Sequence, residues 1–119
     1  MHGNKLAEID SNLFKGLYQL RVISLHDNLI KELNPLLFNN LVNLTSINLS
    51  FNLLKSIDFN LFSGLTNLCY IDLSMNQLTH LDSKLIDGLT SLHRIFTFDN
   101  QLNLNELPPD LLEYVQDFI

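Results

Sequence analysis

Four asparagines recur at an interval of 24 residues, each inside the same frame of aliphatic residues. They are Asn28, Asn52, Asn76 and Asn100. The frame around the first asparagine reads Leu17, Leu20, Ile23, Leu25, Ile30 and Leu33, and the next two units repeat it from residues 41 and 65. Self-similarity at one fixed period indicates units that fold alike and stack on their neighbours, so the chain is a repeat protein.

The register divides the chain, which we interpret as one domain over residues 1–119, into successive units. These are a partial repeat at 4–16, complete repeats at 17–40, 41–64 and 65–88, a modified last repeat at 89–107, and a C-terminal segment at 108–119. The last repeat has Thr97 where leucine is due and Asn105 where another aliphatic residue is due. Because the partial repeat lacks its strand half, we expect the chain to be an excised piece.

The frame L-x-x-L-x-x-I-x-L-x-x-N-x-L-x-x-L, with Phe14, Phe38 and Phe62 at equivalent positions, resembles the leucine-rich repeat family. The resemblance covers roughly residues 4–102 and is closest to the typical 24-residue class, which is frequent in extracellular receptors and matrix proteins. It implies an α/β repeat fold, a short right-handed solenoid with parallel strands on its concave face and an irregular or short helical convex face. It further implies receptor-like recognition through variable positions on the concave strands.

The residues themselves predict strands independently of that resemblance. Between Leu20 and Leu25, aliphatic and other residues alternate with period two, which is typical of a half-buried strand. Strands one repeat apart must stack in parallel, so we expect a sheet of about four short strands. The isoleucines of this frame should form one buried column; they are Ile23, Ile47, Ile71 and Ile95.

Three further columns have structural interpretations. The asparagines are expected to satisfy buried backbone groups where the chain leaves each strand, because an amide side chain both donates and accepts. The phenylalanines are expected to stack in the core of the convex side. A turn with left-handed backbone is expected at Gly16, Asn40, Gly64 and Gly88, since glycine and asparagine tolerate that conformation best.

The segment after Asn100 departs from the register. We expect Asp110 to cap a short helix that covers the last repeat. Its apolar face would consist of residues at helical spacing, namely Leu111, Leu112, Val115, Phe118 and Ile119. The alternative is an incomplete repeat with exposed apolar residues.

The candidate recognition surface consists of the outward positions of the predicted strands. We single out Val22, Ser24, His26, Ser46, Asn48, Tyr70, Asp72, His93, Arg94, Phe96 and Phe98. Ser50 and Ser74 fall on the same outward rows. Aromatic residues with arginine are the types that dominate binding hot spots, so a protein or peptide contact is expected on the last two strands. The alternative is that the C-terminal segment covers Phe96 and Phe98.

No catalytic or cofactor motif is present, and we expect neither an enzyme nor a bound cofactor or metal. Ser24, His26 and Asp27 lie close in sequence, as do Asp72 and His93 in adjacent repeats, but polar strand residues on an open face explain both groups. The net charge of −6, with only seven Lys and Arg, argues against nucleic acid. No apolar run approaches the roughly 20 residues that span a bilayer, so membrane insertion is not expected.

The cellular compartment stays open, with an extracellular domain of a larger protein slightly favoured over an intracellular scaffold or effector. The single cysteine, Cys69, cannot form an internal disulfide. Asn43 and Asn48 begin glycosylation sequons that a repeat rich in Asn, Ser and Thr also produces by chance. Open solenoid ends make a homodimer the alternative to recognition of a foreign protein.

Overall fold

The computed structural model describes residues 5–116, and every strand in that range belongs to one sheet. The strands are β1 (Val22–Ser24), β2 (Ser46–Asn48), β3 (Tyr70–Asp72), β4 (Arg94–Phe96) and β5 (Val115–Gln116). The helices are short: two 3-10 turns, η1 (Ser83–Ile86) and η2 (Leu104–Glu106), and one α-helical turn, α1 (Pro109–Leu112). The expected solenoid of parallel strands with an irregular opposite side is therefore confirmed.

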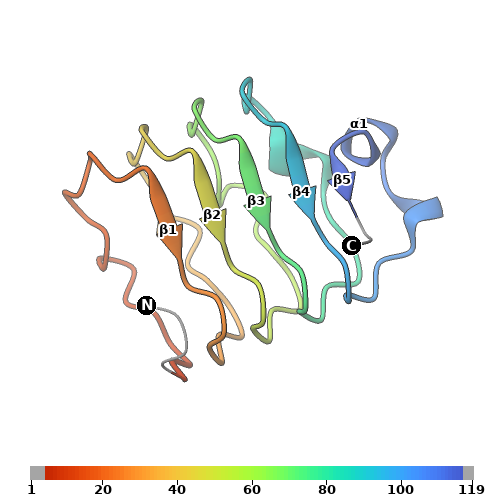
Figure 1. Cartoon of the computed structure of the whole chain (residues 1–119), viewed down its shortest axis with the longest axis horizontal. Coiled ribbons are helices and arrows are strands. Elements are labelled where there is room, and N and C mark those ends of the chain that lie inside the picture. The colour runs from red at the N-terminus through yellow and green to blue at the C-terminus, as the bar shows by residue number, and fades with distance from the viewer. Residues whose placement is uncertain (1–4, 117–119) are drawn as a thin grey trace.

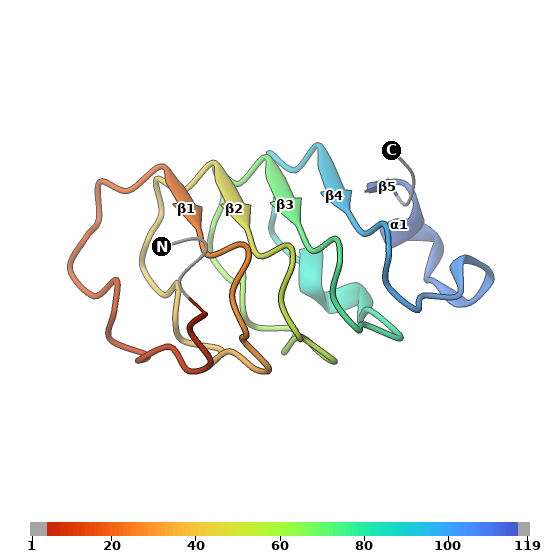
Figure 2. The same ribbon diagram turned by 60° about the horizontal axis from the view of Figure 1, so that its bottom comes forward.

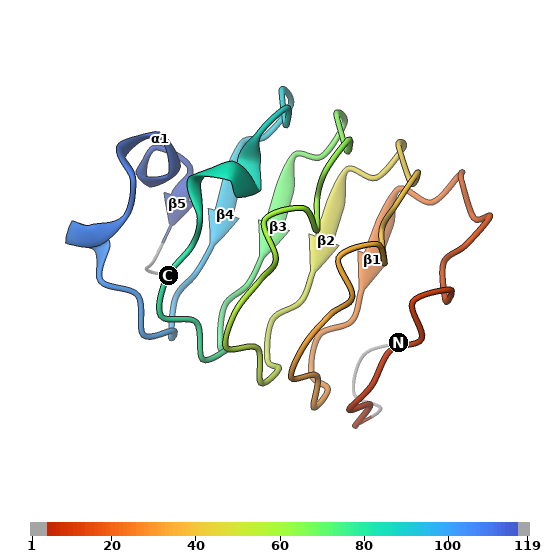
Figure 3. The ribbon, with the colours of Figure 1, turned by 180° about the vertical axis from the view of Figure 1, so that it is seen from behind.

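The strands follow chain order, β1 to β5, and each pairs in parallel with the next. Figure 1 shows the strands side by side, and Figures 2 and 3 show the returning segments on the opposite side of the molecule. The pairing is in register with the repeat, since Ile23 faces Ile47, which faces Ile71. Each repeat therefore makes one coil of the solenoid. The sheet has a fifth strand where the sequence predicted about four.

The core runs between the sheet and the returning segments. The isoleucine column is buried as predicted, with 3% or less of each side chain exposed at Ile23, Ile47, Ile71 and Ile95. The leucines two residues further on, Leu25, Leu49 and Leu73, are fully buried. Burial of one such side chain stabilises the fold by about 1.5–3 kcal/mol, so the aliphatic frame supplies the main attraction between coils.

The asparagine column forms a hydrogen-bond ladder between coils. In the Asn52 side chain, Nδ2 donates to the carbonyl oxygens of Leu49 at 3.1 Å and, one coil back, of Leu25 at 3.0 Å. Its Oδ1 accepts from the backbone N–H of Ile30 at 3.1 Å. Asn76 repeats the pattern with Leu49, Leu73 and Leu54. The predicted structural role of the column is confirmed.

The phenylalanine column also behaves as predicted. The ring centroids of Phe14 and Phe38 lie 6.1 Å apart, and those of Phe38 and Phe62 lie 6.2 Å apart. The last two rings are fully buried or nearly so, which places them in the core and excludes a ligand pocket between them. The turn column is confirmed as well, with positive φ at Asn40 and at the three glycines of the same register.

One column on the returning side escaped the sequence analysis. Asp10, Asn34, Asp58 and Asp82 each accept a hydrogen bond through Oδ1 from the backbone N–H two residues on. The backbone carbonyl of each of these residues also accepts a hydrogen bond from the N–H three residues further on. Each coil therefore contains a tight turn that begins at this position. Both Asp and Asn occur at this position because either side chain can close this local turn.

The predicted C-terminal helix is wrong beyond its first turn. Helix α1 ends at Leu112, and Val115 then enters strand β5, which pairs with β4. Asp110 does not cap the helix; Pro108 occupies the capping position and Asp110 lies in the first turn. Leu111 is fully buried, whereas 45% of Leu112 is exposed. Phe118 and Ile119 lie outside the described residues.

Candidate functional site

The outward side chains of β1–β4 form what we call the strand face. The sheet register aligns them in two rows, Val22–Ser46–Tyr70–Arg94 and Ser24–Asn48–Asp72–Phe96. Because these positions alternate with the buried isoleucines, both rows lie on the side of the sheet away from the core. All are exposed or only partly buried, in agreement with the outward placement that the alternation predicts.

The C-terminal half of this face brings three of the predicted residues together. The Tyr70 and His93 rings lie with centroids 5.8 Å apart and planes tilted by 38°. Arg94 donates through Nη1 to the carbonyl of His93 at 3.0 Å, and His93 Nδ1 lies 2.8 Å from the carbonyl of Ser91. Tyr70 is 46% exposed, and the two basic residues are also exposed. We call this group the Tyr70–His93–Arg94 cluster.

The two phenylalanines beside this cluster are only partly exposed. Phe96 aligns with Gln116 of β5, so the C-terminal segment forms the next strand along the sheet. Thr97, at the position where leucine was due, is fully buried despite its hydroxyl group. Phe98 is half-buried, and its carbonyl accepts from the Met75 N–H at 2.9 Å. Of the aromatic residues proposed for recognition, Tyr70 is thus the most available.

The polar residues of the strand face are engaged in local hydrogen bonds. The Ser24 hydroxyl pairs with His26 Nδ1, and the Ser50 hydroxyl donates to Asn48 Oδ1 at 2.6 Å. Asp72 Oδ1 accepts from the backbone N–H of Ser74 at 3.0 Å. Each of these bonds joins two residues at the carboxyl end of a strand, so the side chains stabilise the turn in which the strand ends.

The outward placement of Ser50 and Ser74 was wrong. Both are buried, with 5% and 0% of the residue exposed. Ser74 Oγ has no hydrogen-bond partner within the described part of the chain, whereas Ser50 Oγ bonds to Asn48. Alternation ends with the strand, because the chain turns inward toward the asparagine column immediately afterwards.

The candidate catalytic groups remain on open surface. Asp27 lies in a hollow with Asp99 at the edge of the sheet. The Cys69 thiol is partly buried and donates weakly to the Asn67 carbonyl at 3.4 Å. Between residues 5 and 116, no group of three or more His, Cys, Asp and Glu side chains is placed to hold a metal ion.

The sequon asparagines both take part in hydrogen bonds of the fold. Asn43 Nδ2 donates to the Tyr18 carbonyl at 2.9 Å, and Asn67 makes the equivalent bond to Val42. Asn48 Oδ1 accepts from both the backbone and the hydroxyl of Ser50. Asn43 and Asn67 thus form a second amide ladder, at the amino ends of the strands, which the sequence analysis missed.

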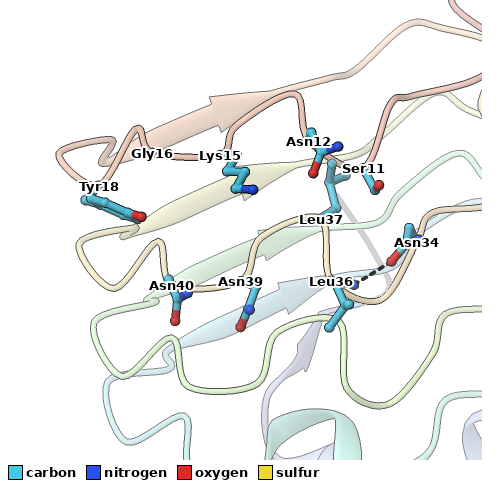
Figure 4. A pocket seen from close by; sticks show the side chains of 10 residues that line it. All are labelled: Ser11, Asn12, Lys15, Gly16, Tyr18, Asn34, Leu36, Leu37, Asn39 and Asn40. Carbon is cyan, nitrogen blue, oxygen red and sulfur yellow. Dashed lines mark hydrogen bonds between the residues drawn. The ribbon is translucent and has the colours of Figure 1, made fainter.

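A hollow on the returning side is a separate feature of the surface (Figure 4). Its volume is about 230 Å³, and it lies between the partial repeat and the first complete repeat. The lining is mostly polar and consists of Ser11, Asn12, Lys15, Gly16, Tyr18, Asn34, Leu36, Leu37, Asn39 and Asn40. The Asn34 carboxamide is already occupied by the N–H of Leu36 at 2.9 Å, as the dashed line shows.

None of the helices found between residues 5 and 116 has the length and apolar character that a membrane crossing requires.

Two solved structures share this architecture. The leucine-rich repeat domain of APL1B matches with a TM-score of 0.87 over 97% of this chain, at 24% sequence identity. TLR13, solved as a complex with ssRNA13, matches with a TM-score of 0.82 over 94% of this chain, at 33% identity. The chain spans 34% of the first of these chains and 17% of the second. Comparison with curated proteins yields no match.

The sequence match to a family model agrees with the architecture. The model described as leucine rich repeat matches residues 1–54 and 42–102, which together extend from residue 1 to just beyond Asn100. The chain belongs to the leucine-rich repeat family.

Proposed function

We propose that the chain is a non-enzymatic recognition module that binds a protein or peptide through the C-terminal half of the strand face. The proposal rests on the Tyr70–His93–Arg94 cluster, in which the exposed Tyr70 ring packs against His93 and Tyr70 is paired in the sheet register with the exposed Arg94. Tyrosine and arginine are the residue types that most often supply binding energy at protein interfaces. Membership of a family of interaction modules supports the same class of function.

A protein partner fits the charge of the chain better than RNA does. The structural neighbour TLR13 was solved with ssRNA13, but the present chain has a net charge of −6. Binding to a phosphate backbone depends on clustered Lys and Arg that release counterions. The outward rows of the four complete strands contain Arg94 and no second arginine or lysine.

The non-enzymatic part of the proposal rests on the geometry of the Ser24–His26 pair, whose two side chains hydrogen-bond to each other. Ser24 and His26 bond to each other at the end of β1, on an open sheet surface. Asp27, the acid nearest in sequence, lines the hollow at the sheet edge. A hydrolase needs a nucleophile, a base and an orienting group in a site that excludes water.

The test uses peptides selected from a random display library against the wild-type chain. Affinity is then measured for a Tyr70→Ala/Arg94→Ala double variant and for an Arg21→Ala/Val22→Ala control, which changes exposed residues at the other end of the face. The double variant should bind about tenfold or more weakly, the usual effect of removing hot-spot residues, while the control binds as wild type does.

Both variants should keep the urea midpoint of the wild type, since all four side chains are exposed. Selected peptides that bind the double variant with unchanged affinity would refute the strand face as the recognition surface. Turnover of a substrate that depends on Ser24 or His26 would refute the non-enzymatic assignment.

Self-association through the solenoid end is the second candidate function, and one residue favours it. Leu17 is 49% exposed, whereas the equivalent Leu41, Leu65 and Leu89 are 1–6% exposed because the preceding coil covers them. An apolar coil end left uncovered favours association with another chain. The solution mass over a range of concentrations distinguishes the candidates: a monomer at all concentrations rejects this one, and a stable dimer favours it.

A further inference from the structure

A column of four residues at the carboxyl ends of the strands has a left-handed backbone. Asp27, Phe51, Met75 and Asp99 occupy equivalent positions immediately before the asparagines, with φ between 56° and 59°. The strand arrowheads in Figure 1 point to this edge of the sheet, which we call the rim. Aspartate tolerates such a conformation, but a bulky residue adopts it only where the surrounding structure imposes it. Phe51 and Met75 are therefore strained members of the column.

The strained residues are also exposed. Half of Phe51 is accessible to solvent, and Met75 is partly exposed. The backbone strain lowers the stability of the folded chain, and half of Phe51 remains in contact with water. Strain of this kind collects at binding surfaces, where the fold holds a side chain in a presented position.

The four rim residues line one hollow, and the negative charges of its two aspartates have no positive side chain beside them in the lining. The hollow is shallow, with a volume of about 330 Å³, and its lining includes all four residues of the column. Phe51 and Met75 lie in the middle two coils, while Asp27 and Asp99 belong to the coils on either side. No Lys, Arg or His contributes to the lining. The hollow thus has an apolar centre between two carboxylates.

We propose that the rim binds an extended peptide segment with the pattern cation–x–apolar–x–cation. Adjacent strands lie about 4.8 Å apart, so three coil steps separate the two aspartates by roughly 14 Å. In an extended peptide, residues one, three and five point to the same side and span about 13 Å. Two basic side chains can then reach Asp27 and Asp99 while the central apolar side chain rests on Phe51 and Met75.

This surface is distinct from the strand face. Its lining shares no residue with the Tyr70–His93–Arg94 cluster. Two lysines, Lys31 and Lys55, line an adjoining hollow that shares Leu53 and Gln77 with the rim. Substituting one of these lysines therefore serves as a control for the aspartate substitutions, because it removes a charge of the opposite sign close to the rim.

The test is fluorescence anisotropy with a labelled nine-residue peptide that has Lys at its third and seventh positions, Leu at its fifth, and Ser elsewhere. The wild-type chain should bind it at millimolar concentration or below, and binding should weaken as salt screens the charges. Asp27→Asn with Asp99→Asn should lower the affinity at least fivefold. Phe51→Asn should lower it at least tenfold and at the same time raise the urea midpoint, because asparagine tolerates a positive φ.

Four controls keep the result specific. The Tyr70→Ala/Arg94→Ala variant should bind the peptide as wild type does, and Lys55→Gln should bind it at least as tightly, because it removes a neighbouring positive charge. A peptide with Glu in place of both Lys residues should bind at least tenfold more weakly. Leu36→Asn removes an apolar side chain that is 64% exposed on the returning side and should leave affinity unchanged. Absence of binding at millimolar peptide, equal binding of the Glu peptide, or unchanged affinity of Phe51→Asn would overturn the proposal.

Discussion

At the scale of single residues, one amide side chain joins two coils. Asn52 donates to carbonyl groups of its own coil and of the preceding one, and it accepts from the N–H of Ile30. These backbone groups are buried where the chain leaves the strand, so sheet pairing cannot satisfy them. An aliphatic residue of similar size would fill the space and leave those groups without partners. This explains in physical terms why the asparagine recurs with the leucine frame.

Replacing Asn52 with alanine should therefore destabilise the chain by about 1–3 kcal/mol, the usual penalty for leaving a buried polar group unsatisfied. The measurement is urea unfolding followed by circular dichroism. Asn67→Ala is the matched control, because that side chain is exposed and makes one bond, to the Val42 carbonyl. A midpoint for Asn52→Ala that equals that of the control would show that the ladder contributes little.

At the scale of elements, the sequence predicted those features that recur with the period. Alternation around Ile23 predicts a strand, and the fixed interval predicts that Ile47 pairs beside it. The column at Asp10, Asn34, Asp58 and Asp82 was missed because two residue types share the position and neither is apolar. The rim was missed for a related reason: phenylalanine and methionine give no sign of positive φ.

The C-terminal segment shows where periodicity stops being informative. Leu111 and Val115 are four residues apart, a spacing that fits one face of a helix. The chain instead makes one helical turn and then pairs with β4, because β4 would otherwise leave an unpaired edge next to a buried column. Tertiary pairing thus overrides the local pattern.

Leu111→Ala should destabilise the chain by about 2–5 kcal/mol, since the side chain is fully buried against the last repeat. Leu112→Ala is the control in the same helical turn, with a side chain that is 45% exposed, and should change stability by less than about 1 kcal/mol. Thermal or urea unfolding measures both. Equal effects of the two substitutions would contradict the placement of this segment as the covering coil.

At the scale of the whole molecule, the two ends of the solenoid differ. Helix α1 and strand β5 cover the C-terminal coil and bury Leu107 and Leu111. At the other end, the partial repeat leaves Leu17 half-exposed although the equivalent leucines are buried. The recognition surface depends on the same stacking, because the register of whole coils brings Tyr70 next to His93. The sequence predicted that these residues face outward, but not which of them touch.

Leu17→Lys tests whether the open end matters for assembly. If the wild-type chain dimerises through this end, the substitution should weaken the dimer at least tenfold, because it places a charge in an apolar contact. Light scattering across a dilution series measures the dimer fraction. A matched Leu36→Lys variant, on the returning side, should behave like wild type. A dimer that is unaffected by Leu17→Lys must form through another surface.

The most direct measurement of the central claim is an NMR titration of the labelled chain with a peptide selected on it, following backbone amide shifts. The proposal predicts that the largest shift changes fall at residues 69–72 and 93–96, around the Tyr70–His93–Arg94 cluster. Shift changes that fall instead on the returning side, on the exposed end near Leu17, or on the rim would contradict recognition through the strand face.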